Sequence, residues 1–173
     1  MAKLTLQDKE NISDMYINEF KAELIRAKER IKQNSFLWAY PIALALQKSP
    51  YFLAIQWLIE CLQIYLYEFK SPRISELNKY IQQARDLSNI LTFLQCNEIA
   101  QEIWYLSGRD EIQTAIARLW WSISAFNNGK EHGGIMEVVA AIELILPDTS
   151  NCLLLDRYLQ VAVKIYEEYE SQN

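Results

Sequence analysis

The sequence predicts an all-α fold, a compact antiparallel bundle of about seven to eight helices. Only four glycines and four prolines occur in 173 residues, so regular structure occupies most of the chain. Apolar residues recur every three or four positions in one segment after another, and no segment alternates as a strand would. Links of roughly two to six residues favour antiparallel neighbours. A short α-α superhelix of degenerate helical hairpins is the alternative.

The first predicted element is a long, charged amphipathic helix over residues 1–33, packed outside the core of a single domain that spans residues 1–173. Half of the composition is hydrophobic (51%) and 23% is charged, which is typical of a globular chain. Charges fill one face of this first helix. Its apolar face is expected to consist of Ile12, Tyr16, Phe20, Leu24, Ala27 and Ile31.

Caps and prolines predict where the next helices begin. Ser35 is expected to cap a short helix that carries Pro41 in its first turn. Ser-Pro pairs at 49–50 and 71–72 are expected to start two longer helices. These end near residues 69 and 94, the second with a break near Ser88.

In the second half of the chain, glycines and a proline mark the helix ends. The expected first residues or caps are Asn97, Asp110, Gly134 and Ser150, and the expected ends are Gly108, Gly129 and Pro147. Three segments are apolar on nearly all sides, at 50–69, 110–126 and 134–146. We expect these three helices to form the centre of the bundle.

Cysteine usage and hydropathy predict a cytoplasmic protein that contacts no membrane. Cys61, Cys96 and Cys152 are odd in number and far apart, and they lie in apolar patterns without zinc-site spacing. Buried free thiols in a reducing compartment are therefore expected. The N-terminus lacks an apolar signal core, and the apolar segment 50–69 carries a polar stripe that is typical of a core helix.

The net charge of −5 argues against a nucleic-acid partner, because such proteins usually carry a basic face. Residues 109–173 hold five basic and ten acidic side chains, which accounts for the whole deficit. A charged partner of this chain is therefore expected to be basic.

Few residues could support catalysis. His132 is the only histidine, so it would have to serve as the base for any serine or cysteine nucleophile, and no GxSxG motif is present. Glu98 and Glu102 share a helix face, but the Glu-x-x-His pairs of di-iron bundles are missing. We expect no catalytic residue, no cofactor and no metal, and an enzyme is the less favoured class.

Residues 126–138 hold three of the four glycines and the only histidine. Gly133 and Gly134 are expected at a helix N-terminus, where backbone N–H groups beside Lys130 and His132 could hold an anion. The spacing of a phosphate-binding loop is absent, and a helix, not a strand, precedes the segment. A turn between two core helices is therefore the favoured interpretation.

Aromatic and acidic residues supply the remaining candidates for a partner surface. Trp121 is expected on the flank of a central helix. The favoured interpretation is that Trp120 and Trp121 both belong to the core, and the alternative is that Trp121 lines a groove or a partner surface. The C-terminal helix places two tyrosines one turn apart among glutamates, which could meet a basic partner. The candidate partner or ligand residues are Trp121, Lys130, His132, Gly133, Gly134, Tyr166, Glu167, Glu168, Tyr169 and Glu170.

The predicted function is therefore a non-enzymatic protein-interaction module: an adaptor, an inhibitor or immunity-like protein, or a scaffold. Its expected partner is another protein, and the same surfaces would also suit a homo-oligomer. The alternative is a small-molecule-binding protein or enzyme with an apolar aromatic pocket between helices. In that alternative the wall would be formed by Trp38, Trp57 and Trp120.

Overall fold

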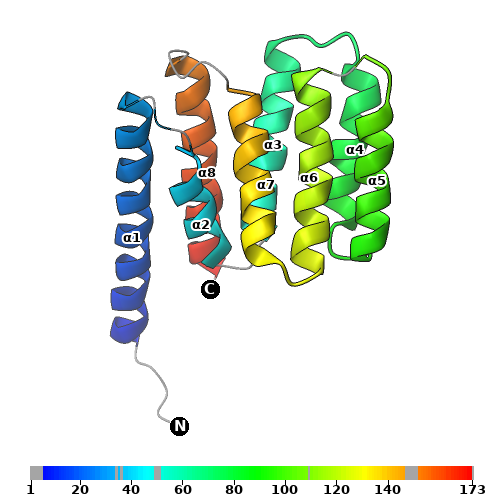
Figure 1. Ribbon diagram of the computed structural model, residues 1–173. Helices are drawn as coiled ribbons and strands as arrows, with labels where there is room; N and C mark the ends of the chain where they lie inside the picture. Colours follow the sequence, from blue (N-terminus) through cyan, green and yellow to red (C-terminus); the bar gives the residue numbers. More distant parts are fainter. Residues whose placement is uncertain are drawn as a thin grey trace.

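The computed structural model describes residues 6–33, 35, 37–48, 52–108, 110–146 and 152–172, with side chains from residue 18 onward except those of residues 48 and 152. These residues form eight α-helices and no strand (Figure 1), so the predicted all-α bundle is confirmed. The helices are α1 (Leu6–Lys32), α2 (Tyr40–Lys48), α3 (Phe52–Glu68), α4 (Ile74–Leu87), α5 (Phe93–Tyr105), α6 (Glu111–Asn127), α7 (Glu131–Leu144) and α8 (Cys152–Gln172).

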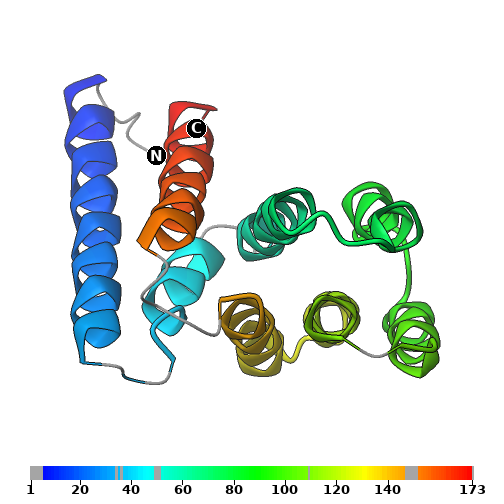
Figure 2. The ribbon, with the colours of Figure 1, turned by 90° about the horizontal axis from the view of Figure 1, so that it is seen from above.

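Helices α3 to α7 run side by side in two layers, with α3 and α4 in one layer and α5, α6 and α7 in the other (Figure 2). Successive helices in this group run antiparallel. Helix α2 packs against α3 and α7, and α8 packs against α3 and α2. Helix α1 lies outermost, next to α2 and α8 (Figures 1 and 2). Within the described residues, no helix is long and apolar enough to cross a membrane.

The core is centred on α3, α6 and α7, the three helices whose sequences are apolar nearly all round. Nine of the 17 residues of α3 and ten of the 17 residues of α6 are buried. Trp57 and Trp120 are fully enclosed there, and both satisfy their indole N–H groups. Trp57 donates to the carbonyl of Tyr158 (2.9 Å) and Trp120 to the carbonyl of Tyr80 (3.3 Å). Cys61 and Cys96 are buried free thiols, as predicted.

Several predicted helix boundaries are confirmed. The side chain of Asp110 accepts a hydrogen bond from the backbone N–H of Gln113 (2.8 Å) and caps α6. Gly108 (φ +82°) and Gly129 (φ +69°) adopt the left-handed conformation expected of glycines that follow a helix. Pro41 lies in the first turn of α2. The predicted starts at 49–50 and 150 and the predicted end at 147 lie outside the described residues.

The prediction that Asn97 caps a helix is wrong. Helix α5 begins six residues after Leu87, at Phe93, and its N-cap is Thr92. The Thr92 hydroxyl accepts from the N–H of Gln95, and the Gln95 side chain accepts from the N–H of Thr92, which forms a capping box. Two orphan donors are satisfied in this way, so the helix starts there and Asn97 lies inside it.

Ser35 does not cap α2, which begins only at Tyr40. The preceding turn is held instead from another helix, because the backbone N–H groups of Leu37, Trp38 and Ala39 face the Glu143 carboxylate on α7 and act to lower its pKa. Leu37 has a left-handed backbone (φ +63°), an unfavourable conformation for a branched side chain. The contact with α7 therefore holds a strained turn in place.

Helix α7 begins at Glu131, so the prediction that Gly134 starts it is wrong and both glycines lie in its first turn. A Cβ atom at Gly134 would lie 2.8 Å from three ring atoms of Phe126 on α6. At Gly133 the nearest atoms would lie 3.9 Å away, an ordinary van der Waals distance. Gly134 is thus required by helix packing, and Gly133 is not.

Candidate functional site

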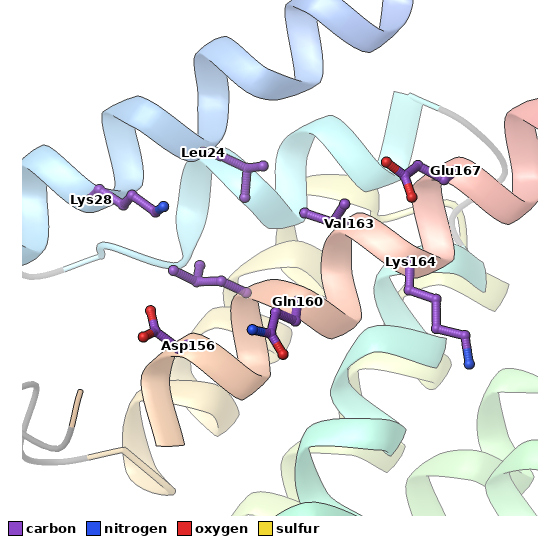
Figure 3. Close-up of a pocket in the computed structure, with 8 residues that line it drawn as sticks. Leu24, Lys28, Asp156, Gln160, Val163, Lys164 and Glu167 are labelled. Atoms are coloured by element: carbon purple, nitrogen blue, oxygen red, sulfur yellow. The ribbon is translucent and has the colours of Figure 1, made fainter. Parts of the chain in front are cut away.

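The candidate residues fall on two separate surfaces. The first is a groove between α1 and α8, about 380 Å³ in volume, and we call it the α1–α8 groove (Figure 3). It is lined by Leu24, Lys28, Asp156, Leu159, Gln160, Val163, Lys164 and Glu167. The second is an open depression of about 500 Å³, the α6–α7 hollow, lined by Arg118, Trp121, Ala125, Lys130, Gly133 and Glu137.

The α1–α8 groove lies next to an aromatic contact between these two antiparallel helices. The rings of Phe20 and Tyr166 stack at a centroid distance of 4.2 Å with an interplanar angle of 3°. Further along, Leu24 faces Val163 across the groove (Figure 3). These two side chains and Leu159 give the groove an apolar floor, which is an arrangement that accepts apolar side chains of another segment.

The rim of the α1–α8 groove carries charges of both signs. Lys28 and Asp156 lie at one end, and Lys164 and Glu167 lie at the other (Figure 3). Asp156 and Glu167 are 11 residues apart on α8, or about 16 Å along the helix axis. The groove therefore has the length of roughly three helical turns.

The last turns of α8 add an acidic cluster beside this rim. Glu168 pairs with Lys164 at 3.7 Å, an exposed ion pair of small energetic value. Glu167 is exposed and Glu170 partly exposed, and no basic residue occurs in the last turn of α8. Negative charge near the C-terminus of a helix opposes its macrodipole, so a cation bound there would be stabilising.

The two candidate tyrosines of α8 are less accessible than the glutamates. Tyr166 is only 5% exposed because it stacks on Phe20, so it holds α1 against α8. Tyr169 is partly buried and packs against the core. The part of this helix end that faces outward is therefore acidic.

The α6–α7 hollow brings together three of the candidates, Trp121, Lys130 and Gly133. Arg118 on α6 donates from Nη1 to Oε2 of Glu137 on α7 at 2.7 Å. His132 is exposed but does not line the hollow, and Gly134 is buried against Phe126.

One wall of the α6–α7 hollow is formed by a fixed indole. Trp121 is half-buried and packs on Trp104 of α5, with a centroid distance of 5.2 Å and an interplanar angle of 51°. Tilted aromatic contacts of this kind favour one ring orientation. Trp121 therefore offers a positioned flat surface on the flank of α6.

The described cysteines are poorly suited to nucleophilic catalysis. Burial raises the pKa of the Cys61 thiol well above its ordinary value, with a smaller contribution from the charge of Glu60. Burial also raises the pKa of Cys96. Because the thiolate is the reactive form, both groups are held unreactive at neutral pH. Among the described residues, no group of three or more His, Cys, Asp or Glu side chains could hold a metal ion.

Glu102 has a structural partner that the sequence did not reveal. The hydroxyl of Tyr80 donates to Oε1 of Glu102 at 2.5 Å. Burial, followed by this hydrogen bond, raises the pKa of Tyr80 to about 12. Glu102 therefore ties α5 to α4 and does not act as half of a carboxylate pair with Glu98.

The aromatic pocket of the alternative prediction is not open to solvent. Trp38, Trp57 and Trp120 are all buried, each with 3% exposure or less, and lie within the core. Comparison of the chain with protein-family models, with curated proteins and with solved structures gives no match. Functional inference therefore depends on the two surfaces themselves.

Proposed function

We propose that this protein is a non-enzymatic protein-interaction module that binds an amphipathic helix of a basic partner protein in the α1–α8 groove. The observation that carries this proposal is the groove between α1 and α8, in whose lining Leu24 and Val163 are partly exposed and Leu159 is buried. A helix in this position would insert residues spaced three, four and seven apart, as in other helix-in-groove complexes.

The acidic side chains beside the groove favour a partner helix that carries basic residues. The acidic cluster of Glu167, Glu168 and Glu170 lies beside one end of the groove, and among the described residues only Glu168 of the three forms an ion pair, with Lys164. A partner helix with a basic end beside this cluster would gain both from charge attraction and from relief of the unfavourable α8 macrodipole. The other end, with Lys28 and Asp156, is balanced and imposes no such preference.

The first experiment asks whether a partner occupies the groove in the cell. A photo-crosslinking amino acid is placed at Gln160, which is exposed and lines the groove. The matched control carries it at Gln101, which is exposed on α5 on the far side of the bundle. A crosslinked product that forms from position 160 and not from position 101 is expected. Identical products from both positions, or none from position 160, would contradict the proposal.

The second experiment tests the charge argument with the partner captured in this way. Glu167→Lys combined with Glu170→Lys should weaken binding by about tenfold at low salt, because two charges of the acidic cluster are reversed. Glu168 is left in place since it pairs with Lys164. The control, Asp86→Lys with Glu98→Lys, changes the net charge equally at exposed positions on α4 and α5. Equal weakening by both double variants would show that net charge alone matters, which would refute the groove as the binding site.

A further inference from the structure

The α6–α7 hollow combines features that the protein-interaction proposal does not use. Two cationic side chains, one carboxylate and one indole line this open depression. The lining carries two positive charges, on Arg118 and Lys130, and one negative charge, on Glu137, so its net charge is +1, whereas the net charge of the protein is −5. The local sign is thus opposite to that of the whole molecule.

Arg118 keeps unused hydrogen-bonding capacity. Only its Nη1 group is bonded to Glu137; its Nε has no acceptor among the described residues but is buried, so a ligand in the hollow would meet the Nη groups. A guanidinium has five N–H donors, and an unsatisfied donor is costly. Glu137 also shows that a carboxylate can approach this side chain at 2.7 Å.

Lys130 supplies the second cation from the other side of the hollow. The described part of the chain offers it no ion pair within 4 Å. The nearby acid Glu131 is directed elsewhere, because its Oε2 accepts from Nε2 of Gln47 on α2 at 2.9 Å. The ammonium group of Lys130 is therefore available to an anion.

Two small residues, Ala125 and Gly133, line the hollow and leave it unfilled. A Cβ at Gly133 would lie 3.9 Å from the Cβ of Ala125, so a methyl group would fit without a clash. A glycine within a helix costs up to about 1 kcal/mol relative to alanine. Since packing does not require this glycine, its structural effect is to leave the space beside Trp121 open.

From these contacts we infer that the α6–α7 hollow binds a small aromatic carboxylate, with the ring against Trp121 and the carboxylate between Arg118 and Lys130. The single excess positive charge matches a monoanion. The indole, positioned by Trp104, gives a flat ring a stacking surface. This site is separate from the α1–α8 groove, and its occupancy does not depend on the proposed protein partner.

The test uses 2-naphthoate as the probe and 2-naphthamide as the neutral probe of the same shape. Binding to the full chain is followed by NMR through the indole N–H of Trp121, identified with Trp121→Phe, and the amide N–H of Gly133. We expect saturable shifts at these two groups with a Kd on the order of 0.1–1 mM. Naphthamide should bind at least about tenfold more weakly, because it lacks the charge-assisted hydrogen bonds.

Variants separate this site from general attraction to the surface. Lys130→Gln should weaken naphthoate binding by about tenfold, whereas Lys164→Gln, which removes an exposed lysine from the other surface, should leave it unchanged. Each variant is first shown to keep the wild-type pattern of shifts outside the hollow. The inference is overturned if naphthamide binds as well as naphthoate, if both lysine variants behave alike, or if the shifts do not saturate.

Discussion

Replacing Gly134 with alanine should lower the stability of the fold, whereas the same replacement at Gly133 should raise it. Both glycines lie in the first turn of α7, so both variants gain a similar helix-propensity term of up to about 1 kcal/mol. Only at residue 134 would the new Cβ lie 2.8 Å from the ring of Phe126, which is 5% exposed and enclosed by the core. Overpacking of this kind costs about 1–3 kcal/mol.

The difference between the two variants isolates the clash, because the propensity gain is common to both. We therefore expect Gly133→Ala to be more stable than Gly134→Ala by about 1–3 kcal/mol. The free energy of unfolding is measured by urea denaturation followed by circular dichroism. In a Phe126→Leu background the cost at residue 134 should largely disappear, since the ring that causes it is gone. Free energies of the two glycine variants within about 0.5 kcal/mol of each other would refute the reasoning.

Three further predictions concern single interactions. Asp110→Ala removes the side-chain cap of α6 and should cost about 1 kcal/mol in urea denaturation, while Glu111→Ala, next to it, should cost less. Tyr80 has a pKa raised to about 12 from an ordinary value of 10.0, so the stability that it contributes is present below pH 10 and is lost as the pH rises through 12. In the Tyr80→Phe variant, the free energy of unfolding should therefore change less with pH in that window. An unchanged pH dependence would contradict the assignment. Burial raises the pKa of Glu143 from its ordinary value of 4.5, against the opposing effect of the backbone N–H groups of residues 37–39. The stability that the protonated Glu143 side chain contributes is therefore lost as the pH rises above 4.5. Glu143→Gln should reduce the slope of the free energy of unfolding against pH in this range, and a steeper slope would show that the effect of the N–H groups dominates.

Helix periodicity and local capping could be predicted from the sequence because both depend on neighbouring residues. Asp110, Gly108 and Gly129 acted as expected, since a cap or a left-handed glycine needs no distant partner. Thr92 was missed because two candidate caps lie five residues apart, and the apolar pair that follows Thr92 resembles a continuation of the preceding helix. Local propensity alone did not separate these alternatives.

Contacts between segments that are distant in the sequence could not be predicted. The sequence predicts Gly134 as the first residue of a helix, whereas the structure shows that this glycine is needed to make room for the ring of Phe126 on another helix. The Arg118–Glu137 ion pair joins residues 19 positions apart and has no sequence signature. For the groove, the stripe of Asp156, Gln160, Val163 and Glu167 recurs at helical spacing and could have been recognised, whereas the opposing residues of α1 could not.

The position of α1 has a consequence for cooperativity. In the described part of the chain this helix contacts α2 and α8 and no other helix, so it shares little of the core that α3, α6 and α7 build. Native-state hydrogen exchange should therefore show α1 opening at a free energy below that of global unfolding. A segment that inserts between α1 and α8 would bind only the closed form, so its free energy of binding would be added to the stability of α1. Slower amide exchange confined to α1 would then report occupancy of the groove before the partner itself is identified.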